Sequence, residues 1–113
     1  MKPKYGCPVT AAVKVMAGKW KVAIVWHLMS GAKRYAELRA LLPGVSEKVL
    51  TEQLRHLEAD GVVRRHSAHS SPPRVSYELS SAGAELAPLM QGLCAWGTKH
   101  LGIQPTFSAD KAL

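Results

Sequence analysis

The 113-residue sequence has no long hydrophobic run, only two cysteines and few acidic residues. No apolar stretch approaches the roughly 20 residues that span a bilayer, and no signal-peptide-like apolar segment follows the N-terminal lysines. We therefore expect a cytoplasmic protein. Cys7 and Cys94 are too few for a disulfide framework, so we interpret both as reduced thiols.

The sequence also lacks the residue patterns of common active sites. It contains no glycine-rich phosphate loop, and a nucleophile scheme based on Cys7 would have no carboxylate or oxyanion partner. We therefore expect no enzyme, no catalytic residue and no cofactor. His66 and His69 leave a metal sensor open as an alternative, but no third ligand stands at a matching spacing, so we predict no metal site.

The shortage of acidic residues leaves a strong positive charge. Eight Asp and Glu face 15 Lys and Arg, which gives a formal charge of +7. Such an excess favours a polyanionic partner, namely DNA, RNA or an anionic membrane, although a merely basic soluble protein has the same composition. The length indicates one domain with a modest core, and 47% hydrophobic residues argue against disorder.

Apolar residues at helical spacing predict three helices in the first part of the chain. The second is apolar around most of its circumference, so we expect it at the centre of the domain. In the third, we expect Leu38, Leu41 and Leu42 to face inward. The predicted ranges are 8–17, 19–29 and 36–42.

The next segment combines a charged helix with a two-stranded ribbon. The helix is predicted over 46–60, with Ser46 as its cap and Gly61 at its end. A basic strand over 62–66 follows, and residues 74–79 alternate between polar and apolar, as in a half-buried strand. This order is typical of a winged DNA reader, in which the helix enters a major groove and the ribbon contacts neighbouring DNA.

The last predicted helix covers 80–101 and carries an apolar stripe close to a heptad seam. Pro88 falls inside this range, where it should remove a hydrogen bond and bend the helix. We divide the chain into an arm over 1–6, one domain over 7–101 that includes the dimerisation helices, and a flexible tail over 102–113.

Eight short segments, in order, resemble the HxlR-type winged helix-turn-helix transcriptional regulators. Tyr35 stands where Phe is common in that family. The segments are 7–9 (CPV), 18–21 (GKWK), 26–28 (WHL), 34–39 (RYAELR), 42–46 (LPGVS), 50–61 (LTEQLRHLEADG), 72–77 (PPRVSY) and 93–97 (LCAWG).

The resemblance implies a mainly α fold with a small antiparallel β wing (α+β). It also implies a homodimer that is held by the first and last helices and bound to a palindromic operator. We expect a repressor or a dual regulator, with a winged-helix protein-interaction module as the alternative. The expected dimer interface includes Val9, Val13, Leu89, Leu93 and Trp96.

Candidate DNA contacts lie on the charged helix and the ribbon. Ser46 and Lys48 can reach phosphates or base edges, Thr51 a thymine methyl or a phosphate, and Arg55 a guanine or a phosphate. Glu52 can accept from cytosine or pair with Lys48 or Arg55. The alternative is a plain solvated helix face. Further candidates are Arg65, His69 and Arg74 on the wing, and Lys33 and Arg34 as phosphate clamps; Arg74 could instead pair with Glu78.

Cys7 is the candidate sensor residue. A thiol at a helix N-terminus near Lys2 and Lys4 should have a lowered pKa. The resemblance implies that electrophiles, aldehydes or oxidants could act through Cys7, whereas the alternative is a small packing residue at the dimer interface. Cys94 is expected to be inert core. A non-covalent effector in an apolar pocket between the central and last helices stays open.

Overall fold

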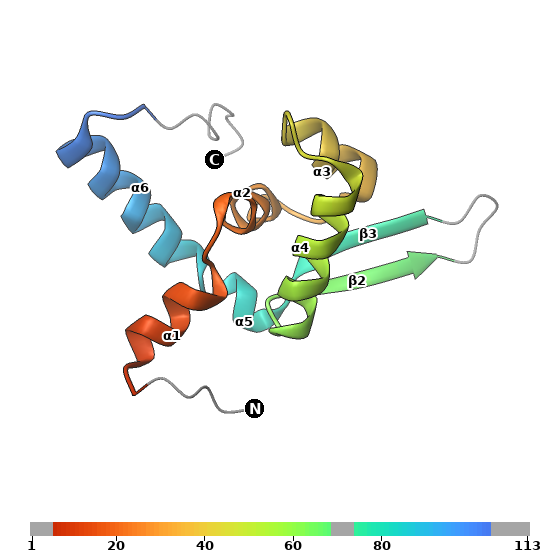
Figure 1. The fold of residues 1–113 in the computed structure, drawn as a ribbon, viewed down its shortest axis with the longest axis horizontal. Coiled ribbons are helices and arrows are strands. Elements are labelled where there is room, and N and C mark those ends of the chain that lie inside the picture. Colours follow the sequence, from red (N-terminus) through yellow and green to blue (C-terminus); the bar gives the residue numbers. More distant parts are fainter. Residues whose placement is uncertain (1–5, 69–73, 105–113) are drawn as a thin grey trace.

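A computed structural model describes residues 6–68 and 74–104, and α2 (Lys19–Leu28) lies at the centre of the fold (Figure 1). Ile24 and Val25 are fully buried, and Trp26 and Leu28 nearly so. A helix that is apolar on nearly every side can bury all its faces only between other elements. The predicted central position of this helix is confirmed.

The first helix is shorter than predicted. α1 (Pro8–Val15) begins with Pro8 in its first turn and ends before Met16. The amides of Met16 and Ala17 close tighter turns onto the carbonyls of Val13 and Lys14, at 3.1 and 3.2 Å. Gly18 then adopts φ 107°, which L side chains rarely do, and separates α1 from α2.

Two further helices form the helix-turn-helix. α3 (Tyr35–Leu41) buries Leu38, and Leu42 just beyond it is also buried. Leu41 is 41% exposed, so its predicted inward orientation is wrong. α4 (Glu47–Ala59) packs on the core through three leucines one helical turn apart, Leu50, Leu54 and Leu57.

The three strands form one antiparallel sheet in the order β1 (Lys33–Arg34), β3 (Arg74–Leu79), β2 (Val63–Ala68). β3 has the predicted bounds, whereas β2 begins one residue later than predicted and extends further. Tyr77 pairs with Lys33 on one side and with Arg65 on the other. The β2–β3 ribbon projects away from α1 and α6 (Ala87–Leu101) (Figure 1).

The predicted single helix over 80–101 is wrong. The chain forms α5 (Ser81–Ala84), capped by the Ser80 hydroxyl, and then α6. Pro88 lies in the first turn of α6, where no intrahelical amide bond is lost. In a continuous helix its ring would clash with the carbonyl of Ala84, the last residue of α5.

No helix in the described ranges is long and apolar enough to cross a membrane.

Candidate nucleic-acid interface

The exposed side of α4 carries most of the predicted DNA contacts. Ser46 caps the helix as predicted, because its hydroxyl accepts the Val49 amide at 3.1 Å. Lys48, Glu52 and Arg55 are exposed. Among the described residues no ion pair joins Glu52 to Lys48 or Arg55, so the alternative of a helical pair is not formed.

Thr51 differs from the other predicted contacts on α4. It is half-buried, and its hydroxyl lies 3.2 Å from the Tyr35 hydroxyl. Tyr35 also donates to the Glu47 carbonyl at 3.1 Å. The Thr51 hydroxyl is therefore used to join α4 to α3. No sequence signal identified Tyr35 as its partner, since the pairing depends on how the two helices pack.

The wing has two chemically different faces, because successive strand residues point to opposite sides. On one face, Glu78 lies 2.6 Å from His66 Nε2 and 3.7 Å from an Arg64 nitrogen. The His66 hydrogen bond, together with the positive charges of His66 and Arg64, lowers the pKa of Glu78. Glu78 is thus paired across the ribbon with β2, and not with Arg74.

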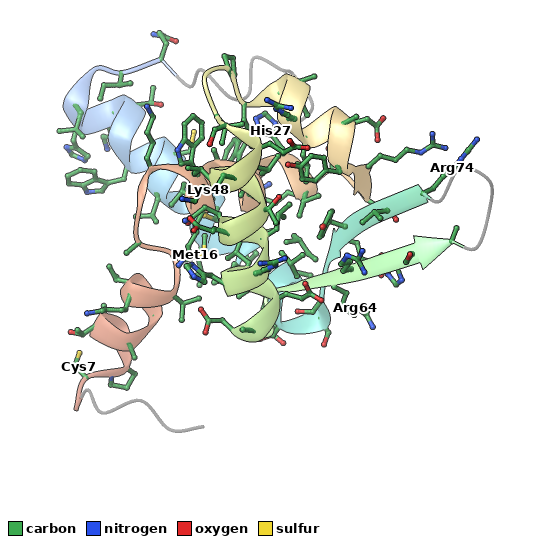
Figure 2. The ribbon with its side chains drawn as sticks, turned by 45° about the vertical axis from the view of Figure 1, so that its right-hand side comes forward. Cys7, Met16, His27, Lys48, Arg64 and Arg74 are labelled. Carbon is green, nitrogen blue, oxygen red and sulfur yellow. The ribbon has the colours of Figure 1, made fainter. Side chains whose placement is uncertain are left out.

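A cleft of about 620 Å³ lies next to α4, where it is bordered by β2 and β3. Its lining includes three of the predicted DNA contacts, Arg34, Arg65 and Arg74, together with Tyr35 and Thr51. Figure 2 shows Arg74 at the far end of the ribbon. The structure therefore gathers residues from the two predicted groups, the phosphate clamps and the wing, into one concave surface.

Two other predicted contacts lie elsewhere. Lys33 is half-buried outside this cleft, and its Nζ donates to the Ser30 hydroxyl at 3.1 Å. His69 lies outside the described residues. The DNA contacts of all these side chains stay predictions.

α1 and α6 lie at the end of the molecule opposite the ribbon (Figure 1), and this end exposes large apolar side chains. α1, α2 and α6 border a groove of about 790 Å³, whose lining includes Val9, Val13, Leu89 and Leu93. These four residues and Trp96 are between 56% and 70% exposed, although all are large and hydrophobic. Leu101 and Ile103 were not predicted to be part of this surface, but they are equally exposed, because the apolar surface continues past the predicted stripe.

Cys7 caps α1 and is fully exposed at the apolar end (Figure 2). The Thr10 amide, the Thr10 hydroxyl and the Val9 amide lower the pKa of Cys7, because they stabilise the thiolate at the start of the helix. The predicted lowering is confirmed, but Lys2 and Lys4 lie outside the described residues. Cys94 is half-buried and packs against the core, at the wall of the apolar groove.

Metal-binding groups are dispersed. Across residues 6–68 and 74–104 no cluster of three His, Cys, Asp or Glu side chains could hold a metal ion.

A helix-turn-helix followed by a β-ribbon, with basic side chains on both, defines a winged helix-turn-helix DNA-binding protein. The family described as HxlR-like helix-turn-helix matches residues 15–105. The chain belongs to this family of transcriptional regulators. It is 48% identical over 100 residues to the HTH-type transcriptional regulator YtcD of Bacillus subtilis (strain 168), which covers 88% of this chain and 79% of YtcD.

Two solved structures of regulators are also similar. The redox regulator HypR in its reduced form has a TM-score of 0.80 at 38% identity, over 84% of this chain and 96% of HypR. The reduced form of the transcriptional regulator YodB from B. subtilis has a TM-score of 0.76 at 31% identity, over 85% of this chain and 95% of YodB. These similarities confirm the predicted fold class and the DNA-binding regulator class.

Proposed function

We propose that the protein is a homodimeric regulator that binds a palindromic operator and that loses or gains DNA affinity when Cys7 is modified. The observation that carries the proposal is the separation of two surfaces. α4 and the basic ribbon lie on one side of α2, and α1 and α6 lie on the other (Figure 1). The exposed large apolar side chains are concentrated on α1 and α6. One end is suited to DNA and the other to a second copy of the chain.

The proposed pairing surface consists of exposed hydrophobic side chains on α1 and α6. Soluble monomers rarely expose large contiguous apolar patches, and twofold dimers bury the same patch on both subunits. Val9 and Val13 of α1 face the same groove as Leu89 and Leu93 of α6. Two copies related by a twofold axis would cover both helices together.

The pairing is tested by sedimentation of two variants that add the same charge to α6. Leu93→Glu places a carboxylate in the groove and is expected to give a monomer, because burying an unpaired charge is costly. Gln91→Glu adds it at an exposed residue that does not line the groove, and is expected to stay dimeric. A wild-type protein that sediments as a monomer at micromolar concentration would contradict the pairing.

DNA recognition then follows from the geometry of the pair. Two α4 helices in successive major grooves read half-sites about 34 Å apart, with the ribbons on flanking DNA. Duplexes selected from a random pool should therefore share an inverted repeat with half-sites spaced by about 10–10.5 base pairs. Affinity should fall steeply as salt rises, since Lys and Arg displace counterions. A protein-interaction module would select no duplex.

Modification of Cys7 would act as a chemical signal on the surface of α1 and α6 through which two copies pair. Its thiolate sulfur can add to the electrophilic carbon of an enone or quinone, and the carbonyl-derived oxygen then takes a proton from water. Cys7 immediately precedes the helix that carries Val9 and Val13, so an adduct would disturb the surface through which two copies pair. The similarity to HypR, described as a redox regulator, supports a thiol-based signal.

The signal is tested by adding benzoquinone to the protein–DNA complex. Wild-type protein and Cys94→Ser are expected to change affinity for the selected duplex, whereas Cys7→Ser is expected not to respond. Equal responses of the wild-type and Cys7→Ser proteins would remove Cys7 from the mechanism.

A non-covalent apolar effector is the second candidate signal. The observation that favours it is the groove itself, because its volume of about 790 Å³ falls within the range of ligand pockets and its lining is almost entirely apolar. Such an effector would release DNA from the Cys7→Ser variant as well as from the wild-type protein.

A further inference from the structure

We propose that Thr51 reads a thymine in each half-site through its side-chain methyl group, while Tyr35 holds its hydroxyl. The sequence alone leaves a thymine methyl and a phosphate as alternative partners of Thr51. The inference rests on the proposed DNA binding and chooses between these two partners, so it assigns a base preference to one position of the operator.

Thr51 lies between two basic side chains on α4. Lys48, Thr51 and Arg55 are spaced by three and four residues, so they follow one another along one side of the helix. Lys48 and Arg55 are exposed, and Thr51 is half-buried and lines the cleft next to α4. A stretch of major groove that contacts both basic side chains therefore passes Thr51.

The hydroxyl of Thr51 has no proton left for DNA. The Tyr35 hydroxyl has a single proton, which it donates to the Glu47 carbonyl at 3.1 Å. The 3.2 Å bond between the two hydroxyls therefore uses the proton of Thr51. Because the oxygens of a phosphate diester only accept hydrogen bonds, Thr51 can bind a phosphate only by giving up its bond to Tyr35.

The methyl group of Thr51 is then the part that can contact a base. It shares the Cβ atom with the hydroxyl, so the bond to Tyr35 also fixes the direction of the methyl. Thymine carries a methyl group into the major groove, and threonine methyls make apolar contacts with it. Such a contact removes both methyl groups from water, and it needs no proton from either side.

The test replaces the thymines of the selected duplex by deoxyuridine, one position at a time and symmetrically in both half-sites. This change removes only the methyl group from the major groove. For the wild-type protein, one position is expected to weaken binding by about fourfold per half-site, the effect of leaving one methyl group unburied.

Two variants of Thr51 separate its methyl from its hydroxyl at that position. Thr51→Ser keeps the hydroxyl and lacks the methyl, so it is expected to bind the thymine and deoxyuridine duplexes equally. Thr51→Val keeps a methyl and lacks the hydroxyl, so it is expected to retain the preference for thymine. Each comparison is a ratio of two affinities of one preparation, so a lower folded fraction cancels.

The matched control is Thr10→Ser, which removes the same methyl group from an exposed residue of α1 that does not line the apolar groove. This variant is expected to distinguish the two duplexes as the wild-type protein does.

The outcomes separate this inference from the proposed function. If Thr51→Ser still prefers thymine, another group reads the methyl; if Thr51→Val no longer does, Thr51 acts through its hydroxyl. Either result makes the inference wrong, although DNA binding stands, and so does a half-site in which no thymine responds to the loss of its methyl. A wild-type protein that selects no duplex would instead overturn the proposed function.

Discussion

The hydroxyl groups of Tyr35 and Thr51 lie 3.2 Å apart and join the start of α3 to the second turn of α4. Through its bond to the Glu47 carbonyl, Tyr35 also reaches the first turn of α4. A Phe at this position would have no hydroxyl to offer. Tyr35 therefore supplies a polar link that fixes α4 against α3.

Removing this link should lower stability with little change in shape. Tyr35→Phe is expected to reduce the free energy of unfolding by about 1 kcal/mol, the usual net value of such a hydrogen bond. Urea denaturation of Tyr35→Phe, Thr51→Val and the double variant measures the coupling, which should be about 0.5–1.5 kcal/mol. Strictly additive effects would show that the two hydroxyls do not depend on each other.

Arg55→Ala should separate base reading from phosphate binding. Arg55 is exposed on α4, and a bidentate contact to guanine contributes about 1–3 kcal/mol of discrimination. Titrations with the selected duplex and with a scrambled duplex should show a larger loss on the selected one. Equal losses on both would mean that Arg55 contacts only phosphate.

Alkylation of Cys7 should depend on pH in a way that reveals its lowered pKa. The thiolate is the reactive form, so the rate with iodoacetamide rises as pH passes through the pKa. In a Cys94→Ser background, the midpoint should lie below that of the same thiol in a short unfolded peptide, because the groups of Thr10 and Val9 stabilise the thiolate.

Thr10→Val is the matched variant for this measurement. It removes the hydroxyl and keeps both amides, so the midpoint should rise part of the way toward the peptide value. A folded protein and a peptide with the same midpoint would contradict the stabilisation of the thiolate.

Gly83 should not tolerate a side chain. A Cβ atom at Gly83 would lie 2.1 Å from the Val62 carbonyl oxygen, which already accepts the Ser80 amide. Gly83→Ala is therefore expected to lower the free energy of unfolding by about 1–3 kcal/mol or more. Gly92→Ala on α6 meets no atom within 4 Å and should instead raise it by about 0.5–1 kcal/mol. Urea denaturation measures both.

Local pattern was sufficient to predict most of the fold. The cap at Ser46, the leucines of α4 and the alternation along β3 are each determined within a few residues, and all three predictions are confirmed. The break between α5 and α6 was missed because the apolar spacing continues across it. The position of Pro88 was the available signal, since a helix tolerates proline in its first turn and not in its interior.

The candidate site could be predicted only in part. Charge and order along the chain identified Arg34, Arg65 and Arg74, but their common cleft depends on the strand order of the sheet. The bond between Thr51 and Tyr35 was not predicted, because the two residues are distant in sequence. Long-range pairings of this kind are set by tertiary packing, which one-dimensional spacing does not encode.

The short connection after Ala84 has a mechanical consequence. The start of α5 is held against the residue before β2, because the Ser80 amide donates to the Val62 carbonyl and Gly83 packs closely on that carbonyl. α6 begins as a separate helix at Ala87. In a symmetric pair built on α6, any tilt at this joint is applied once in each subunit. A rotation of a few degrees there would change the distance between the two α4 helices by twice the displacement of either one. A small change at the α1–α6 surface would then alter the match between the two α4 helices and the helical repeat of DNA.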